Sequence, residues 1–365
     1  MSRNKQIHVG EPYLPPFREI VPLLEQIWSS GRLSNRGFFH QEFETELANY
    51  LDIPHVSLFS NCTTGLLVAL KTLSITGEVI TTPFSFAAST NVLKWSGLEP
   101  VFVDINPHTF NIDTNLIENA ITENTTAILA VHAYGNPCDV EKIDIIAKKY
   151  SLKVIYDGAA SFGSQYNDKS ILSYGDLSVV SFHATKVLNT FEGGAILCFD
   201  PLMKQRIDKI RNFGLGRNNL IEEIGINGKM SEFNAALGIT QLKYYQDTYI
   251  KRLEIAGRYN EEFSCLDNIE IPNMLKSNYY NYSYYPILIS RELNITVQYI
   301  LHQLEKKGIY AKRYYYPLLI ENKSMHNKFH NASDISERIL CLPLYPNLTK
   351  NDQQRVINEF KFLVT

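Results

Sequence analysis

The sequence has 365 residues, of which 45% are hydrophobic, and its formal net charge is −3. This length suffices for a sizeable core in one large and one smaller domain. The near-neutral charge argues against nucleic-acid binding, because no basic excess is present to neutralise phosphates. No run approaches the ~18 apolar residues that span a bilayer, and the N-terminal segment lacks the apolar run of a secretory signal.

The cysteines are five in number and widely spaced, with no pair at zinc-finger or C-x-x-C spacing. This pattern is typical of a reduced, cytoplasmic protein with buried thiols. His326 and His330 stand four positions apart, but no third ligand is evident nearby, so we expect no metal site.

Apolar runs and amphipathic segments alternate from about residue 41 to residue 200. The predicted strands are 55–59, 78–82, 100–103, 127–131, 154–156, 178–182 and 194–198. The predicted helices are 63–72, 86–95, 113–121 with Asp113 as its N-cap, and 140–150. This alternation predicts an α/β domain whose mostly parallel sheet is covered by helices on both faces.

A long helical stretch is predicted from residue 230 to about 263, leading out of the large domain. The remainder contains a strand at 284–289, a helix at 296–307, a tyrosine-rich run at 314–316 and a final helix at 350–363. These elements predict a smaller α+β domain. We therefore divide the chain into a large domain at 1–245 and a small domain at 246–365.

The segment S-F-H-A-T-K at 181–186 follows an apolar strand and precedes the turn E-G-G at 192–194. A lysine in a loop at a strand end can be partly desolvated, which lowers its pKa and makes its amine nucleophilic towards aldehydes. Asp157 ends an upstream strand, at the sheet edge where α/β proteins bind ligands. Its carboxylate there could pair with a protonated pyridine nitrogen, or it could cap a helix. These neighbours distinguish Lys186 from an ordinary surface lysine.

Two further segments follow predicted strands. The run S-N-C-T-T-G at 60–65 opens a helix, whose backbone N–H groups form an anion site or a plain capped helix end. The run F-S-F at 84–86 could place an aromatic ring against a flat heterocycle or pack in the core. Neither segment has the glycine-rich loop of a nucleotide-binding fingerprint.

These segments occur in an order that resembles the DegT/DnrJ/EryC1/StrS family of nucleotide-sugar aminotransferases, which are fold-type I pyridoxal 5′-phosphate enzymes. The resemblance covers nearly the whole chain. It includes S-G-R-L-S-N-R-G at 30–37, V-H-A-Y-G at 131–135, G-I-N-G-K-M-S-E at 225–232 and C-L-P-L-Y-P at 341–346. It implies a mixed, mostly parallel seven-stranded sheet in the large domain.

The resemblance also implies roles for individual residues. Lys186 would bind the cofactor covalently and then move the proton, Asp157 would pair with the pyridine nitrogen, and Phe86 would stack on the ring. The residues that would hold the phosphate are Thr63 and Thr64 through their backbone, Ser181 through its hydroxyl, and Asn227 from the other subunit of a homodimer.

Two positions depart from the family pattern. The usual D-A-A-[HQ] reads D-G-A-A at 157–160, so Ala160 stands where a polar side chain usually reaches the cofactor near its phenolic oxygen. This departure concerns the tuning of the cofactor and not its binding. Cys62 replaces the glycine of the usual N-G-T, which is tolerable if that residue is not at positive φ.

His183 would line the sugar pocket, and a histidine at this position resembles members that aminate carbon 4 of the sugar. The resemblance therefore implies dTDP-4-dehydro-6-deoxyglucose as amine acceptor and glutamate as donor, in a pathway to surface polysaccharide. Lys312, Arg313 and Tyr315 are candidates for diphosphate or sugar contacts, with a packed β edge as the alternative.

Several alternatives stay open. Arg211 could face the site or form a salt-bridged helix end, and His132 could belong to the site or the core. The enzyme could act on carbon 3 or on a UDP- or GDP-sugar. A catalytically silent scaffold of the same fold is a further alternative, against which the joint presence of Lys186, Asp157 and Ser181 argues.

Overall fold

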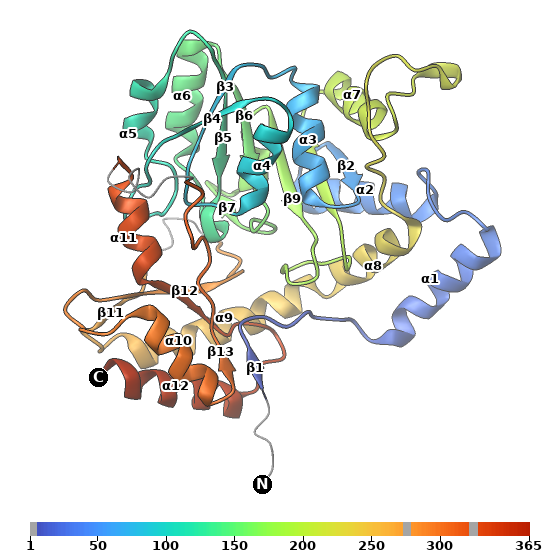
Figure 1. The fold of residues 1–365 in the computed structure, drawn as a ribbon. Coiled ribbons are helices and arrows are strands. Elements are labelled where there is room, and N and C mark those ends of the chain that lie inside the picture. The colour runs from blue at the N-terminus through green and yellow to red at the C-terminus, as the bar shows by residue number, and fades with distance from the viewer. Residues whose placement is uncertain (1–5, 273–278, 321–327) are drawn as a thin grey trace.

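A seven-stranded sheet lies at the centre of the computed structural model, which describes residues 6–272, 279–320 and 328–365 (Figure 1). Its strand order is β2-β10-β9-β6-β5-β3-β4. The strands are β2 (His55–Phe59), β3 (Glu78–Thr81), β4 (Glu99–Phe102), β5 (Thr125–Val131), β6 (Lys153–Asp157), β9 (Leu177–Ser181) and β10 (Gly194–Cys198). Because β10 runs antiparallel to both neighbours and the other pairs are parallel, the predicted mixed sheet is confirmed.

Helices cover both faces of this sheet. Val179 packs in a core cluster with the helices α3 (Cys62–Thr72), α4 (Ala87–Trp95) and α7 (Pro201–Arg211). The next residue, Val180, points to the other face and packs with α2 (Phe38–Leu51) and α8 (Glu232–Lys243). Farther along, α6 (Val140–Tyr150) covers the same face as Val180. Burial on both faces explains why the strands read as continuous apolar runs.

Some predicted helices differ from the observed ones in extent. The helix predicted at 113–121 is a short α5 (Thr114–Ile117) followed by a 3-10 turn at Glu118–Ala120. Asp113 is its N-cap as predicted, because its carboxylate accepts a hydrogen bond from the Asn115 N–H. The long stretch after residue 230 is two helices, since α8 ends before Tyr244 and α9 (Tyr245–Phe263) begins after it.

A smaller unit of helices and an antiparallel sheet follows α9 and occupies the lower part of Figure 1. Its sheet has the order β11-β12-β14. Its elements are β11 (Ile269–Glu270), β12 (Tyr285–Ile289), α10 (Val297–Lys306), α11 (His330–Arg338), β14 (Ile339–Leu342) and α12 (Lys350–Val364). Side chains of α9, α10, α12 and these strands form one core cluster.

The first described strand belongs with this smaller unit. Strand β1 (Ile7–His8) pairs in parallel with β13 (Ile309–Tyr310), and Ile7 is fully buried in the same core cluster. The N-terminal residues therefore pack against the C-terminal part of the chain, although the sequence placed them in 1–245. The division at residue 245 stays a prediction. A strand of two residues has no periodicity by which sequence reasoning could find it.

None of the helices within 6–272, 279–320 and 328–365 is long and apolar enough to cross a membrane. The sequence did not predict several elements of the large part of the chain. They are α1 (Phe17–Ser30), α2, α7 and a hairpin of β7 (Gln165–Tyr166) and β8 (Lys169–Ser170).

The outer edge of β2 is closed by a buried ion pair. The Leu58 N–H donates to Oε1 of Glu44 over 3.1 Å, and the Leu58 carbonyl accepts from Nη1 of Arg211 over 2.6 Å. Arg211 and Glu44 pair with each other at 2.9 Å. Burial alone would raise the pKa of Glu44, but Arg211 and Lys204 hold it at about 2. Arg211 is thus a salt-bridged helix end, and the pair satisfies an edge that would otherwise be open.

We expect Arg211→Ala to lower the free energy of unfolding by about 3–5 kcal/mol, because it leaves a buried carboxylate without its main partner. Denaturant unfolding followed by circular dichroism measures the change. Lys148→Ala is a suitable control, since it breaks an exposed pair with Asp144 that contributes little. Equal losses in the two variants would contradict the role given to Arg211.

Candidate active site

Most of the predicted site residues meet at one edge of the sheet. Asp157 is the last residue of β6 and Ser181 is the last residue of β9. In the antiparallel strand between β9 and β2, Gly194 pairs with Ser181 on one side and with Phe59 on the other. The carboxyl ends of β2, β6 and β9 therefore lie at the same edge, where open α/β sheets bind ligands.

The N-terminus of α3 lies beside Ser181. A Cβ added to Gly194 would come within 2.8 Å of the Cys62 nitrogen, so only glycine allows this close approach. Asn61 caps the helix, and its Oδ1 accepts from both the N–H and the hydroxyl of Thr64 over 2.8 and 2.9 Å. Both donors of Thr64 are therefore hydrogen-bonded to Asn61, whereas the sequence predicted that the Thr64 backbone would hold the phosphate.

The remaining donors at this helix end suit an anion. Within the described part of the chain, no hydrogen bond uses the N–H groups of Cys62 and Thr63. The Ser181 oxygen accepts from the His183 N–H over 3.3 Å, which leaves the hydroxyl proton of Ser181 to donate. Two first-turn N–H groups and nearby hydroxyls form a cup of the kind that holds a phosphate. We call these donors of Cys62, Thr63 and Ser181 the anion cup.

The Asp157 carboxylate is buried and held from both sides. Its Oδ2 accepts from the Ser89 hydroxyl over 2.7 Å, and its Oδ1 accepts from the Ala159 N–H over 3.0 Å. Ser89 is fully buried in the first turn of α4. The two hydrogen bonds fix the carboxylate group, which is not the cap of a following helix. A fixed, buried carboxylate is suited to hold a cationic ring nitrogen.

Lys186 lies in the turn that follows Ser181, and its backbone N–H donates to the His183 carbonyl. Its Nζ is 3.4 Å from the hydroxyl of Tyr284 and 5.8 Å from the centre of that ring. Burial tends to lower the pKa of Lys186, but Tyr284, Cys62 and Asp157 outweigh it and raise the pKa. The net rise differs from the lowered pKa that the sequence argument assumed, because a phenol from the C-terminal part faces the amine.

Phe86 and His183 lie at the open side of the site. Phe86 is the N-cap residue of α4. Its side chain is 68% exposed, so the face of its ring is free to receive another ring. The His183 ring contacts the Thr185 hydroxyl at 3.0 Å and lies 3.6 Å from a carboxylate oxygen of Glu192. About half of the His183 side chain is exposed, at 47%. Both positions agree with a wet substrate pocket.

The three residues predicted to contact the nucleotide sugar have different surroundings. The Tyr315 ring packs with its centre 5.1 Å from that of Phe84 and 5.0 Å from that of Tyr134, and burial, Tyr284 and Asp157 raise its pKa. Lys312 exchanges backbone hydrogen bonds with Cys341, so a packed β edge is present there. The guanidinium of Arg313 stacks 3.2 Å from the Tyr316 ring and pairs with Glu337 of α11 at 3.0 Å. Arg313 therefore has structural partners already.

Asn227 lies on a loop that runs beside the anion cup of the same chain. The neighbouring Gly228 accepts the Ser60 N–H over 2.9 Å, and a Cβ added to Gly228 would contact Thr64 at 2.9 Å. Asn227 itself is exposed. Its side chain is therefore free to contact a group outside its own chain, and its predicted role across a dimer interface stays a prediction.

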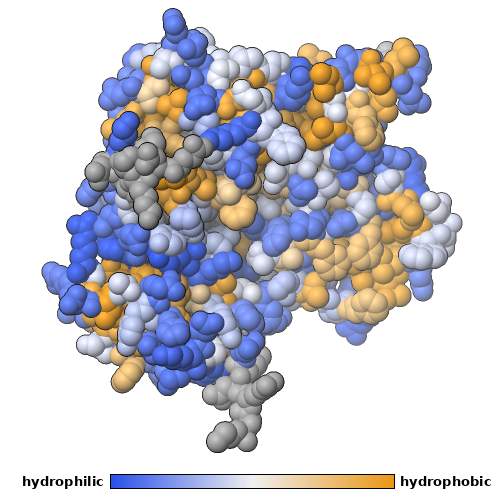
Figure 2. Space-filling model, viewed as in Figure 1, coloured by the Kyte–Doolittle hydropathy of each residue, from blue (hydrophilic) through white to orange (hydrophobic). Residues whose placement is uncertain are grey.

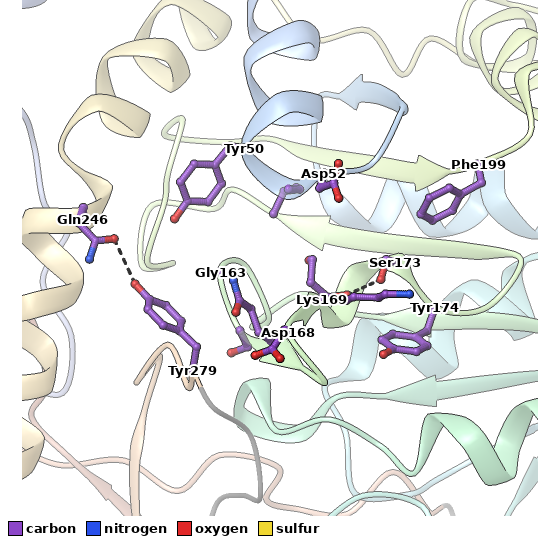
Figure 3. Close-up of a pocket in the computed structure, with 14 residues that line it drawn as sticks. Tyr50, Asp52, Gly163, Asp168, Lys169, Ser173, Tyr174, Phe199, Gln246 and Tyr279 are labelled. Carbon is purple, nitrogen blue, oxygen red and sulfur yellow. Dashed lines mark hydrogen bonds between the residues drawn. The ribbon is translucent and has the colours of Figure 1, made fainter.

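Two histidines and a cavity lie apart from the site. Burial lowers the pKa of His132 to about 3, and its ring stacks on Tyr156 at 4.6 Å, so it is a neutral core residue. His326 lies outside the described residues, and among the described ones no group of three potential metal ligands occurs. A cavity of about 470 Å³ is lined by residues that include Tyr50, Asp52, Tyr174, Phe199 and Tyr279 (Figure 3). It lies near the starts of β2 and β9, opposite to Asp157 and Ser181.

Sequence reasoning missed two residues of this site. Ser89 is three positions after Phe86, in the first turn of the helix that Phe86 precedes, and that spacing could have indicated it. Tyr284 comes from a segment almost a hundred positions after Lys186. One tyrosine among the 22 of this sequence carries no signal that would single it out.

Comparisons with known proteins agree with this geometry. The model of the DegT/DnrJ/EryC1/StrS aminotransferase family matches residues 18–361. The chain is 43% identical to dTDP-4-amino-4,6-dideoxy-D-glucose transaminase of Shigella dysenteriae, over 98% of this chain and 99% of the relative. The solved structure of DesI in the presence of its TDP-sugar product has a TM-score of 0.95 and 29% identity, covering 100% of this chain and 94% of that one. NtdA of Bacillus subtilis with bound cofactor PMP has a TM-score of 0.87 and 29% identity, covering 100% and 87%.

We expect Ser89→Ala to lower the free energy of unfolding by about 1–3 kcal/mol, because the buried Asp157 carboxylate loses a hydrogen-bond donor. Denaturant unfolding of the cofactor-free chain measures this loss. Ser161→Ala is the matched control, since that fully buried hydroxyl has no partner among the described residues. If both variants unfold like the wild type, the Ser89 hydroxyl does not support Asp157.

Proposed function

Because the chain belongs to the DegT/DnrJ/EryC1/StrS aminotransferase family, we propose that it transfers an amino group to carbon 4 of dTDP-4-dehydro-6-deoxy-D-glucose. The product is dTDP-4-amino-4,6-dideoxy-D-glucose, a precursor for surface polysaccharide. The observation that carries this proposal is the 43% identity, over nearly the full length of both chains, to a transaminase of that name. The cofactor is pyridoxal 5′-phosphate.

The described residues fit this cofactor. The anion cup suits its phosphate, because two unpaired N–H groups at a helix N-terminus favour a dianion. The buried Asp157 carboxylate suits its ring nitrogen, and the exposed face of Phe86 suits its ring. When bound, the cofactor withdraws electrons from the α-carbon of the amino donor. A metal is not needed for this chemistry.

Lys186 is the residue that binds the cofactor and moves the proton. Its Nζ would move a proton from the α-carbon of the donor to the C4′ carbon of the cofactor in the first half-reaction, and from C4′ to the sugar carbon in the second. Asp157 keeps the ring nitrogen protonated throughout, since its carboxylate is fixed by Ser89 and Ala159. Two half-reactions through one amine predict ping-pong kinetics.

We also propose glutamate as the donor and His183 as a residue that lines the sugar pocket. The exposed position of His183, in the same turn as Lys186, supports this assignment. Tyr315 and Lys312 border the aromatic cluster around Tyr284 and are the nearest candidates for nucleotide contacts. All five cysteines are free thiols, which supports the reducing cytoplasm as the location of the reaction.

A homodimer is the assembly that we propose, with Asn227 reaching the anion cup of the partner subunit. Large apolar side chains are exposed on α1 and the residues after it, and on the loop after α7, where hydrophobic surface gathers (Figure 2). They are Phe17, Trp28, Leu33, Phe38, Leu220, Ile221 and Ile224. Exposed apolar side chains gathered in this way support a protein interface.

Purified protein incubated with pyridoxal 5′-phosphate should show a visible absorbance band that Lys186→Ala removes. With dTDP-4-dehydro-6-deoxyglucose and glutamate, mass spectrometry and NMR of the product should detect an amine at carbon 4. Amination at carbon 3, or turnover of a UDP- or GDP-sugar alone, would overturn the acceptor assignment. A chain that stays colourless with added cofactor would instead support the silent scaffold.

Mixed dimers test whether Asn227 acts across the interface. Co-expressed Lys186→Ala and Asn227→Ala chains would form heterodimers in which one site has both residues intact. We expect about a quarter of the wild-type activity from random pairing into dimers with two sites, although each parent alone is inactive or nearly so. Activity no higher than the average of the two parents would show that Asn227 serves its own chain.

A further inference from the structure

Tyr284 comes from the C-terminal part of the chain, yet its hydroxyl lies 3.4 Å from Nζ of Lys186. It is the residue immediately before β12. Lys186 lies in the large part of the chain, after β9. The contact therefore joins the amine of the proposed reaction to the smaller unit. Among the predicted site residues, those at 312–315 are the ones that come from this unit.

The segment that carries Tyr284 is attached to the turn after Asp157. Asn281 Nδ2 and Ser283 Oγ both donate to the Ala160 carbonyl over 2.7 Å. Asn281 is fully buried and donates to the Phe162 carbonyl as well, over 2.9 Å. A Cβ added to Gly135 would come within 2.6 Å of the Ala160 carbonyl, and Gly135 is at φ +83, so glycine is required there. The segment is thus held against the site by several buried hydrogen bonds.

Aromatic neighbours fix the Tyr284 ring. Its centre is 5.7 Å from that of Tyr134 in an edge-to-face arrangement and 4.7 Å from that of Tyr314. The Tyr134 hydroxyl donates to the Tyr314 carbonyl over 3.1 Å, which ties these neighbours together. With its ring packed and its segment attached, the Tyr284 hydroxyl has one place to lie, and that place faces Lys186.

A hydroxyl is suited to a lysine that gains and loses a proton. A phenol can accept a hydrogen bond from an ammonium group and can donate one to a neutral amine. The Asp157 carboxylate can only accept, and its two oxygens already bind Ser89 and Ala159. Cys62, the third titratable group that acts on Lys186, is at most a weak donor. Tyr284 is therefore the neighbour that can bind the amine in both of its protonation states.

We propose that Tyr284 is a positioning residue that holds the Lys186 amine while it carries the proton between the cofactor and the substrate. The inference rests on the proposed function, because it requires Lys186 to be the reacting amine. Ala160 has no polar side chain to reach the site, and its carbonyl binds the segment that carries the Tyr284 hydroxyl to the site.

The Tyr284 hydroxyl also affects the titration of Lys186. Burial tends to lower its pKa, and Tyr284, Cys62 and Asp157 together raise it. Removing the Tyr284 hydroxyl takes away a group that stabilises the ammonium form, so the pKa of Lys186 falls in the variant. The neutral amine then persists to lower pH, and the acidic limb of the kcat profile moves to lower pH.

The experiment compares Tyr284→Phe with Tyr282→Phe, a matched control on the same segment whose phenol has no hydrogen bond to Lys186. Cofactor-free chains are labelled with trace acetic anhydride across a pH series, and mass spectrometry of the Lys186 peptide gives its titration curve. We expect the curve of Tyr284→Phe to lie at lower pH than those of the wild type and Tyr282→Phe. Thermal unfolding checks that each variant is folded.

Steady-state kinetics complete the test. For Tyr284→Phe we expect kcat to fall about ten-fold, the size of one hydrogen bond to a charged group, with KM for glutamate little changed. A titration curve and a kcat equal to those of the wild type would overturn the proposal. Failure of pyridoxal 5′-phosphate to protect wild-type Lys186 from acetylation would instead contradict the proposed function, while the comparison of the two tyrosine variants would still stand.

Discussion

The ion pair between Arg211 and Glu44 binds the backbone of β2, a strand at one side of the central sheet. The anion cup lies at the carboxyl end of that strand. Strand β2 is one of the two outer strands of the sheet, and both backbone groups of its Leu58 are bound by these two side chains. The loop after α7 continues along the same edge, because Gly228 accepts the Ser60 N–H and donates to the Arg211 carbonyl. The chain therefore enters α3 from a backbone that is bonded on both sides, and the first-turn N–H groups keep a defined direction.

The groups at the carboxyl ends of the strands also determine how charges are distributed in the site. The cup offers only donors, because Asn61 takes the donors of Thr64 and leaves those of Cys62 and Thr63. One strand away from Ser181, the Asp157 carboxylate supplies a fixed negative group. Burial and this carboxylate raise the pKa of the Cys62 thiol. A ligand with an anionic end and a cationic ring nitrogen matches this arrangement.

Much of this site could be predicted from the sequence because strand ends are visible as the ends of apolar runs. Asp157 and Ser181 follow such runs directly, and parallel strands bring their carboxyl ends together. The bonding of Thr64 could not be predicted, because a helix N-terminus has several N–H groups and the sequence does not show which the cap takes. The sequence does not decide whether Arg211 faces the site or forms a salt-bridged helix end, because a predicted helix end gives its position along the chain but not the side of the sheet that it faces. Tyr284 and strand β1 could not be found, since both depend on contacts between segments that are distant in sequence.

The proposed amine therefore depends on how the two parts of the chain pack together. Buried Arg252 of α9 donates to the Tyr282 and Leu344 carbonyls over 3.3 and 3.2 Å, so the segment that reaches Lys186 is tied to the smaller unit from behind. The same segment is bound to the larger unit through the Ala160 carbonyl. Rotating one unit against the other would break these buried hydrogen bonds, and each unsatisfied group costs about 1–3 kcal/mol. The smaller unit thus forms a fixed side of the site next to Lys186. A change in its packing alters the environment of Lys186 and leaves the anion cup unchanged.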